Sequence, residues 1–501
     1  MIGVDAAELS FIHAHRATLP NFDRLLSRGV LQRLESTAEM PGSVWPTFYT
    51  GKPPGEHGLY HHLQWDPRAM HLRRVTAEWL YAEPFWCELD RRGLSVAVVD
   101  MQMALSSRLQ TGTEIMNWGN HDYVGSFAVK PPHLAREILR RFGRHPMGDE
   151  IPVRKAPVEL ERIRKDLVTG ARQKGRLSRW LLHLRDWDFF LTVFGETHRA
   201  GHVLWPLDPE PQHGEYQPIL DVYQAVDEGI GEVLNAVPED RTVMVFSLHG
   251  MGSNTSQEHF VPAVMDRANE LFETPDADNA PRRGIRSGRS AGRGLFWRSP
   301  KQRSLMRLLR GAVPAEVQNA IAHAVPVWVR DAVVDWQITG GRAWELTPGL
   351  GLLADFNGYL RFNVRGREAR GVLDPDGEAF GRYVDWIRRS FMELRIAGTG
   401  ERLVEDVLLS RDRFPGERSH YLPDALITWA GAPPTSDVRS DTLGQLTAKL
   451  ATGRGGNHRG EGFCIRLEPG ATSGGQAPAG HILDLAPLVL TRLLGEPARR
   501  S

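Results

Sequence analysis

The chain has 501 residues, of which 41% are hydrophobic and 24% charged, and its formal net charge is zero. This is the composition of a globular protein long enough for a large core, and zero net charge offers no electrostatic attraction for a nucleic-acid polymer. The only two cysteines, Cys87 and Cys464, cannot form a disulfide framework or a cysteine-based metal site.

The apolar runs of the sequence are too short, or too often interrupted by charge, to predict a membrane span. Met1 is followed directly by Ile2-Gly3-Val4-Asp5, without the basic and apolar regions of a signal peptide. We therefore expect a cytoplasmic protein without a membrane partner. The sequence carries no signal for an oligomeric state.

In the first half of the chain, buried strands alternate with helices. Strands are expected at residues 2–5, 30–35, 95–100, 188–194 and 242–246, and helices at residues 22–28, 85–92, 131–182 with a break near 143–152, and 217–237. The strand at 188–194 is apolar on both faces, as in a parallel sheet covered on both sides. The alternation predicts an α/β fold with a doubly wound, mostly parallel sheet flanked by helices.

The pattern changes between residues 258 and 344. Arg282 to Arg293 form a Gly/Ser/Arg-rich run typical of a mobile surface loop. We interpret residues 258–344 as an inserted cap region, which divides an α/β core into a first part, 1–257, and a second part, 345–501. Further elements are expected in the second part: strands at 359–367, 421–428 and 463–467, and helices at 377–392 and 482–494.

Carboxylate and imidazole side chains, both of which can bind metal ions, follow the predicted strands or lie in a loop. They are Asp5 after the first strand, Glu196, His198 and His202 after the strand at 188–194, His249 after the strand at 242–246, and His458 in a glycine-rich loop. The carboxyl ends of parallel strands meet at one edge of a sheet, so we expect these side chains to converge. Any one of the 19 histidines is more often a surface or core residue, but four together indicate a metal site, with zinc the preferred ion.

Ser43 is the candidate nucleophile. It precedes a predicted helix that has Pro46 in its first turn, so its hydroxyl would lie among free backbone N–H groups that can bind phosphate. A plain helix cap is the alternative reading. The sequence has no Gly-x-Ser-x-Gly elbow, P-loop, His-Glu-x-x-His or dinucleotide fingerprint.

Longer motifs resemble the alkaline phosphatase superfamily, most closely its type I phosphodiesterase/nucleotide pyrophosphatase branch. They occur in the family's order over almost the whole chain. The matching segments are Ile2 to Asp5, Leu19 to Leu25 with Gly29, Trp45 to Gly58, Phe246 to Met251, Asn457 to Gly462, and Asp484 to Pro487 with Leu494-Gly495. The resemblance implies an alkaline-phosphatase-like fold.

The resemblance also implies two metal ions, usually zinc, on either side of a Ser or Thr nucleophile. Carried over to this chain, one ion would be held by Asp5, Ser43, position 248 and His249, and the other by His198, His202 and His458. The mechanism implied is in-line attack by Ser43 on phosphorus, followed by hydrolysis of the phospho-enzyme.

The metal ligands of this chain depart from the family at two positions. Leu248 stands where the family has a metal-binding Asp, and an aliphatic side chain cannot bind a metal. His198 stands where the second site usually has Asp, and Glu196 could supply the missing charge. We therefore expect one strong metal site, or two sites of which one is depleted.

The position of the nucleophile also departs from the family. The family's nucleophile usually lies two residues further upstream, where this chain has Pro41. Ser43 requires a shortened loop, whereas Thr37 or Ser36 would require a lengthened one. Both Ser43 and Thr37 stay open as nucleophiles.

The leading hypothesis is a metal-dependent hydrolase of phosphate mono- or diesters, acting on a small phosphorylated substrate. The alternative is a catalytically degenerate family member that binds a phosphorylated ligand or a protein partner, and sulfate ester hydrolysis or phosphoryl transfer ranks below both. Asn363, Arg365 and Arg367 could orient a phosphoryl or nucleotide group, with structural ion pairing as an equal alternative.

Overall fold

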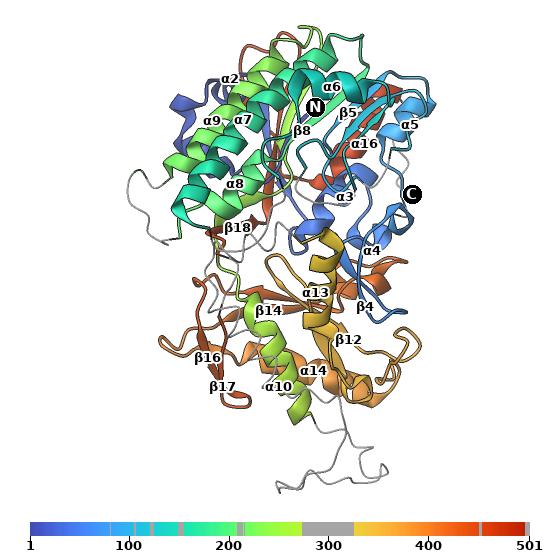
Figure 1. Ribbon diagram of the computed structural model, residues 1–501, viewed down its shortest axis with the longest axis vertical. Coiled ribbons are helices and arrows are strands. Elements are labelled where there is room, and N and C mark those ends of the chain that lie inside the picture. Colours follow the sequence, from blue (N-terminus) through green and yellow to red (C-terminus); the bar gives the residue numbers. More distant parts are fainter. Residues whose placement is uncertain are drawn as a thin grey trace, which may run out of the picture.

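The computed structural model describes residues 1–80, 82–104, 107–120, 125–148, 155–207, 214, 216–272, 325–449 and 453–495. A large sheet with its helices fills the upper half of Figure 1, and smaller sheets fill the lower half. The predicted loop from Arg282 to Arg293 lies outside the described residues.

The large sheet has ten strands. Their order is β20 (Gly475–Gln476), β2 (Val30–Glu35), β19 (Glu461–Leu467), β9 (Val243–Ser247), β1 (Ile2–Val4), β8 (Phe189–Phe194), β5 (Val96–Val99), β6 (Thr113–Met116) and β7 (Ala128–Lys130), and β21 (Gly480–His481) pairs with β2. β1 is parallel to β8 and β9, and β5 is parallel to β8 and β6. Because β19 is antiparallel to both its neighbours and β7 to β6, the predicted α/β sheet is confirmed as a mixed sheet with a parallel centre.

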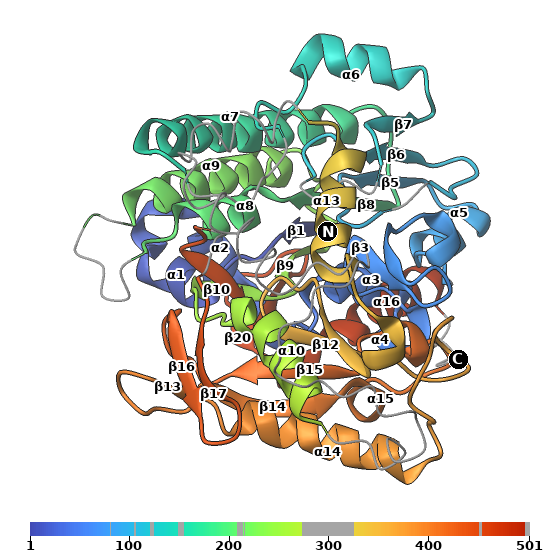
Figure 2. The same cartoon turned by 60° about the horizontal axis from the view of Figure 1, so that its bottom comes forward.

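Helices cover both faces of this sheet, because its strands are apolar on both sides. In β9, Val243 and Val245 face one hydrophobic cluster while Met244 and Phe246 face the other. The first cluster is covered by α1 (Leu9–Ala14), α2 (Pro20–Arg28), α7 (Pro157–Leu182), α8 (Glu196–Leu204) and α9 (Gln217–Leu234), and the second by α3 (Val44–Thr50), α5 (Trp86–Arg91) and α16 (Leu485–Leu494) (Figure 2).

The predicted helical region at 131–182 forms two helices, α6 (Leu134–Phe142) and α7, separated at the predicted break. The segment from Trp45 to Gly58, singled out for its resemblance to the family, contains one short helix after α3, α4 (Pro54–His57). Among the described helices, none is both long enough and apolar enough to cross a bilayer.

The lower unit consists of smaller antiparallel sheets. Its elements are β11 (Gly349–Leu352), β12 (Gly358–Phe362), β15 (Ala425–Trp429) and β14 (Val404–Leu409) in one sheet, β13 (Arg395–Ile396), β16 (Asp437–Ser440) and β17 (Gly444–Thr447) in another, the hairpin β3 (Leu63–Asp66) and β4 (His71–Arg74), and the helices α10 (Val261–Leu271), α13 (Val327–Thr339), α14 (Glu378–Met392) and α15 (Ser410–Arg413). The division expected at residue 344 differs from this arrangement, since the strands from 349 to 447 join the smaller sheets and the chain re-enters the large sheet only at β19. The sequence pattern marks strands but does not show which sheet they join.

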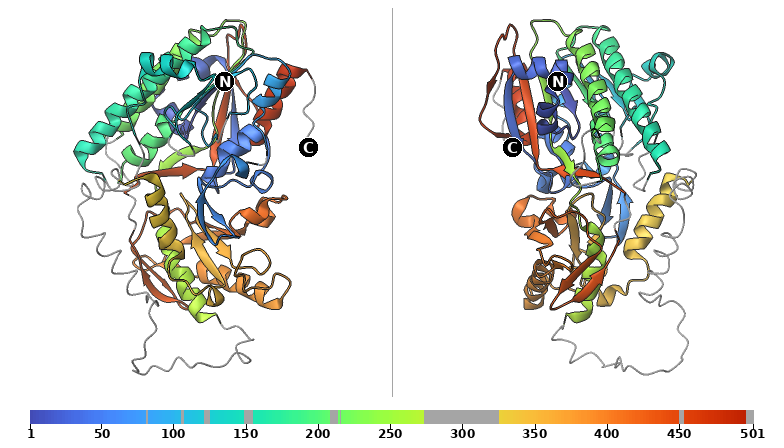
Figure 3. Two further views of the ribbon diagram at one scale, coloured as in Figure 1. Left: turned by 45° about the vertical axis from the view of Figure 1, so that its right-hand side comes forward. Right: turned by 90° about the vertical axis from the view of Figure 1, so that its left-hand side faces the viewer.

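A two-stranded pair lies at the junction of the two units (Figure 3). β10 (Gly250–Ser253) follows directly on β9 and pairs antiparallel with β18 (Gly456–Arg459), with Met251 opposite His458. The predicted glycine-rich loop at 453–462 is therefore partly a strand. A Cβ on Gly456 would lie 2.2 Å from the carbonyl oxygen of Gly201 in α8, so only glycine lets β18 approach this helix.

Candidate metal centre and catalytic site

Five of the predicted site residues converge at the carboxyl edge of the parallel strands. Asp5 follows β1, His198 and His202 lie one turn apart on α8, His249 separates β9 from β10, and His458 lies in β18. Each of two groups, His198–His202–His458 and Asp5–His198–His249, has its ligand atoms within 4.8 Å of one another, and all five side chains are buried.

His198 and His202 face each other through their Nε2 atoms, which lie 2.9 Å apart. Their other nitrogens face acceptors: Nδ1 of His198 lies 2.9 Å from Oδ2 of Asp5, and Nδ1 of His202 lies 3.2 Å from the carbonyl oxygen of Gly456. We assign the Nδ1 protons from these partners. With these tautomers, two Nε2 lone pairs point at each other, an arrangement that a proton or a metal ion between them would stabilise.

Two buried histidines of this group, His202 and His458, are poor bases. Burial, with the nearby charges of Arg454 and His198, holds the pKa of His202 well below its ordinary value. Burial, with the neighbouring His249, His202 and His198, does the same for the pKa of His458. Among the described residues, Nδ1 of His458 has no hydrogen-bond partner. Neutral, closely spaced imidazoles are the donors that zinc and similar ions bind, so the donor set fits a divalent metal.

Asp5 is held from several sides. Oδ1 accepts a hydrogen bond from the indole of Trp45 at 2.8 Å, and Nε2 of His249 lies 4.0 Å from the same oxygen. The carbonyl oxygen of Asp5 accepts from the hydroxyl of Thr197 at 2.6 Å. Trp45, in the first turn of α3, was not among the site residues singled out from the sequence, since its residue type gives no signal of contact with a distant carboxylate.

Leu248 turns away from the polar site. It is fully buried in the hydrophobic cluster that also contains Trp45, Phe48, Phe246 and Leu485. The position where the resemblance implies a metal-binding Asp is therefore part of the apolar layer under α3 and α16.

Ser43 ends a 3-10 turn, Pro41–Ser43, directly before α3, and its hydroxyl is fully buried. Its Oγ lies 3.0 Å from Oγ1 of Thr37 and 3.3 Å from the Thr37 carbonyl oxygen. Oγ1 of Thr37 lies 3.4 Å from Oγ1 of Thr47, which lies 3.0 Å from Nε2 of His57. The two candidate nucleophiles are thus neighbours in one hydrogen-bonded chain.

His57 cannot act as a base at the end of this chain. Its Nδ1 accepts the backbone N–H of Leu59 at 3.0 Å, so the proton is on Nε2 and is donated to Thr47. Burial, reinforced by the charge of Arg418, lowers the pKa of His57 to about 3. The chain therefore orients hydroxyl groups without removing a proton from them.

Glu196, the first residue of α8, belongs to neither histidine group. Its Oε1 is 3.1 Å from Nε2 of His145, and both side chains are buried. Burial alone would raise the pKa of Glu196, but the charge of Lys174 and the hydrogen bond from His145 hold this pKa below its ordinary value. Lys174 in turn contacts the buried carboxylate of Asp100. An ionic network thus anchors the helix that carries His198 and His202.

The proposed phosphoryl-orienting residues lie in the lower unit. The side-chain amide of Asn363 donates to the carbonyl oxygens of Trp344 and Thr347 at 3.1 and 3.0 Å. Arg367 binds both carboxylate oxygens of Asp424, at 2.6 and 2.7 Å, and Arg365 has a side chain that is 65% exposed. These contacts favour the structural role for Asn363 and Arg367, whereas Arg365 lies on the surface, 3.9 Å from Asp374.

The polar junction beside His458 contains residues that the sequence did not single out. Asn457, next to His458, donates to the carbonyl oxygen of Asp355 at 3.0 Å, and the Asp355 carboxylate lies 3.3 Å from Nε2 of His61 and 3.7 Å from Arg454. These residues are far apart in the chain, so the sequence did not indicate that they form a cluster.

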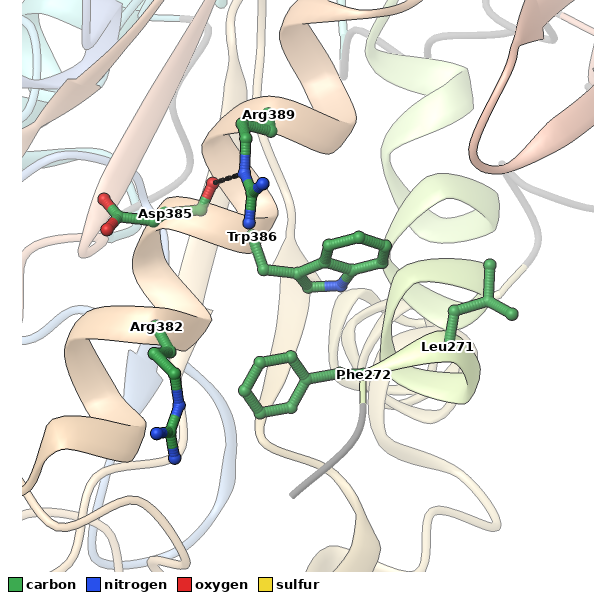
Figure 4. Close-up of a pocket in the computed structure, with 6 residues that line it drawn as sticks. All are labelled: Leu271, Phe272, Arg382, Asp385, Trp386 and Arg389. Atoms are coloured by element: carbon green, nitrogen blue, oxygen red, sulfur yellow. Dashed lines mark hydrogen bonds between the residues drawn. The ribbon is translucent and has the colours of Figure 1, made fainter. Parts of the chain in front are cut away.

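A pocket elsewhere in the lower unit has a volume of about 310 Å³ and is lined by Leu271, Phe272, Arg382, Asp385, Trp386 and Arg389 (Figure 4). It lies where α10 ends beside α14, near the bottom of Figure 1, whereas α8 and β18 lie near the middle. It contains none of the converging histidines and takes no part in the site.

The chain is similar to several known proteins. Residues 1–354 match the family described as "Type I phosphodiesterase / nucleotide pyrophosphatase". Phosphonoacetate hydrolase from Sinorhizobium meliloti 1021, in complex with phosphonoacetate, matches with a TM-score of 0.52 and 13% identity over 98% of this chain and 95% of that chain. The same hydrolase with phosphonoformate matches with a TM-score of 0.50 and 14% identity over 98% and 95%. Murine ectonucleotide pyrophosphatase / phosphodiesterase 5 matches with a TM-score of 0.49 and 12% identity over 100% and 96%.

No curated protein sequence matches this chain. The likeness to the bacterial hydrolase, at low identity, shows a shared fold and confirms the expected alkaline-phosphatase-like architecture.

Proposed function

The chain belongs to the type I phosphodiesterase / nucleotide pyrophosphatase family, and from that premise we propose that it is a metal-dependent hydrolase of small phosphate mono- or diesters. The proposed metal ligands are His198, His202 and His458, and zinc is the preferred ion. Asn363, Arg365 and Arg367 are left out of the proposed site because they bind other parts of the lower unit.

The observation that carries this proposal is the face-to-face approach of the Nε2 atoms of His198 and His202, 2.9 Å apart. Both Nδ1 atoms face oxygen acceptors, so both Nε2 lone pairs are available for one shared cation. His458 lies against both rings, with ring centroids 4.9 Å from each. Three imidazoles from α8 and β18 thus present donors to one point, as in catalytic zinc sites with three protein ligands.

A divalent ion bound there would polarise a phosphoryl oxygen and neutralise charge that develops on it. Ser43 is the proposed nucleophile: its Oγ forms a bond to phosphorus as the bond from phosphorus to the ester oxygen breaks. The proton lost from the Ser43 hydroxyl is balanced by the proton that the departing oxygen takes up. A water molecule then breaks the Ser43–phosphorus bond, which releases the phosphoryl group and restores the hydroxyl. Thr37 orients the Ser43 hydroxyl through contacts of 3.0 and 3.3 Å.

A second candidate function is a degenerate family member that binds a phosphorylated ligand or a protein partner without turnover. Two observations favour it: Leu248 is buried among apolar side chains, and the Ser43 hydroxyl is hydrogen-bonded to Thr37 with no base at the end of the chain. The metal site and the convergence of Asp5, His198, His202, His249 and His458 favour the hydrolase.

Turnover under metal control separates the two candidates. The protein is stripped with a chelator, reloaded with Zn²⁺, and assayed on bis-p-nitrophenyl phosphate and p-nitrophenyl phosphate. The hydrolase reading predicts release of p-nitrophenol that is lost on stripping and recovered on reloading. Saturable binding of a phosphate ester without release, before and after reloading, supports the degenerate member instead.

A further inference from the structure

We propose that Asp5 is a positioning residue that orients His198, and that the chain holds a single metal ion on three histidines instead of a pair of ions. This inference rests on the proposed metal site of His198, His202 and His458. It concerns the second group of potential ligands, Asp5, His198 and His249, whose atoms also lie within 4.8 Å of one another.

The Asp5 carboxylate has a hydrogen-bonding partner at each of its two oxygens. Oδ1 accepts the indole N–H of Trp45 at 2.8 Å, and Oδ2 faces Nδ1 of His198 at 2.9 Å. The backbone is fixed as well, since the N–H of Asp5 donates to Phe194 at 2.8 Å and its carbonyl oxygen accepts from Thr197 at 2.6 Å. A carboxylate clamped in this way is aimed at the far nitrogen of His198.

The proton on Nδ1 of His198 limits this residue to one metal ion. This residue belongs to both groups of potential ligands. A neutral imidazole has one lone-pair nitrogen, and the other nitrogen carries a proton. To bind one ion through Nε2 and another through Nδ1, His198 would have to lose that second proton. With Asp5 accepting from Nδ1, the proton stays and Nε2 alone is the donor.

Two of the proposed ligands, His198 and His202, each have an oxygen acceptor at Nδ1. Nδ1 of His198 faces a carboxylate and Nδ1 of His202 faces the carbonyl oxygen of Gly456, 3.2 Å away. Such acceptors fix the tautomer and orientation of metal-binding imidazoles and raise their basicity. Asp5 and Gly456 therefore play the same part on two neighbouring ligands of α8.

A further ligand is missing beside the second group, because position 248 carries a leucine. Leu248 is fully buried in an apolar cluster together with Trp45, the residue that binds Oδ1 of Asp5. The apolar layer thus closes over the place where a further carboxylate would complete a second site. Trp45 covers β1 closely, since a Cβ on Gly3 would lie 3.0 Å from its Cη2 atom.

The test measures metal binding, not turnover. Zn²⁺ stoichiometry is determined by elemental analysis, and the dissociation constant by competition with a chromophoric chelator, for the wild type, Asp5→Asn, Trp45→Phe and His198→Ala. The expected wild-type stoichiometry is one ion per chain. Asp5→Asn keeps one ion but binds it about 10–100-fold more weakly, Trp45→Phe also keeps one ion, and His198→Ala loses it.

A spectroscopic readout accompanies the binding data. In the zinc-loaded wild type, the His198 Nδ1 proton in its hydrogen bond to Asp5 should give a downfield imidazole N–H resonance. Asp5→Asn should shift this resonance and His198→Ala should remove it, whereas a purely structural effect of Asp5 on folding would not single it out. Circular dichroism shows whether each variant is folded. If Asp5→Asn does not fold, Trp45→Phe is measured in its place, since it keeps the carboxylate but removes the hydrogen bond from the indole.

The outcomes separate this inference from the proposed function. Two tight ions in the wild type, of which Asp5→Asn removes one without weakening the other, would overturn the positioning role and leave the hydrolase intact. No tight ion in the wild type would overturn the proposed metal site itself, and with it this inference.

Discussion

Oδ2 of Asp5 lies 2.9 Å from Nδ1 of His198, although the two residues are 193 positions apart in sequence. β1 and β8 are neighbours in the sheet, which places the end of one strand beside the first turn of the helix that follows the other. The contact joins the two groups of potential ligands into one centre. In the proposed site, it would supply negative charge beside a histidine at the position where the resemblance implies an aspartate.

Substitutions at the two hydroxyl residues should identify the nucleophile. Ser43→Ala is expected to lower kcat for bis-p-nitrophenyl phosphate by a factor on the order of 10³–10⁶, since it removes the attacking oxygen. Thr37→Val removes an orienting hydrogen bond and is expected to cost less than about tenfold. Both variants should keep the wild-type zinc content. The reverse ranking, with Ser43→Ala near full activity, would make Thr37 the nucleophile.

Restoring the missing carboxylate should not restore a second metal. Leu248→Asp places a charge among apolar side chains, and we expect a loss of about 3–5 kcal/mol in the free energy of unfolding with zinc content unchanged. Leu248→Asn, of the same shape without the charge, is the matched control and should lose less. If Leu248→Asp bound one more ion and zinc stabilised it, the prediction would be wrong, and the apolar layer would be able to rearrange to admit a second metal.

Glu196 should affect stability more than metal binding. Glu196→Gln removes a charge that lies beside His145 and near Lys174, and a loss of about 1–3 kcal/mol in the free energy of unfolding is expected. Zinc stoichiometry should stay at one ion per chain. Chemical denaturation and chelator competition are measured on the same preparation. A loss of the ion from a folded Glu196→Gln variant would mean that Glu196 is itself a ligand.

Glu114 gives the protein a pH-dependent stability. Burial in β6 raises the pKa of Glu114 from 4.5 to about 7. Between these values the unfolded chain is ionised while the folded chain keeps the proton, so the free energy of unfolding falls as pH rises and levels off above about pH 7.

Glu114→Gln should remove this dependence. The variant is expected to gain up to about 3 kcal/mol over the wild type near pH 8 and little near pH 4, measured by urea denaturation across the range. A constant difference between the two proteins at all pH values would contradict the proposed protonation of Glu114.

The sequence predicts the histidine site better than the surroundings of the nucleophile. Asp5, His198, His202 and His249 follow strands that were visible as apolar runs, and neighbouring parallel strands bring their carboxyl ends together. His458 comes from the antiparallel pair of β10 and β18, where the sequence showed only a glycine-rich loop. The contacts that set their roles were not visible. Trp45 and the carbonyl oxygen of Gly456 act through tertiary packing, which has no local sequence signature.

The fold was predictable to a similar depth. The alternation of strands and helices gave the sheet and both its layers, and the break between α6 and α7 followed from glycine and proline. The antiparallel position of β19 and the separate sheets built from residues 349–447 depend on pairing between distant segments. Arg365 and Arg367 looked suited to bind phosphate, but residue type alone does not reveal that Asp424 already binds Arg367.

The most direct test of the proposed hydrolase is zinc content measured together with turnover in the wild type and in His202→Ala. Nε2 of His202 faces that of His198 at the proposed ion. We therefore predict one tight ion and p-nitrophenol release in the wild type, and loss of both in the variant. A wild type with less than one tight ion, and without turnover that depends on His202, would contradict it.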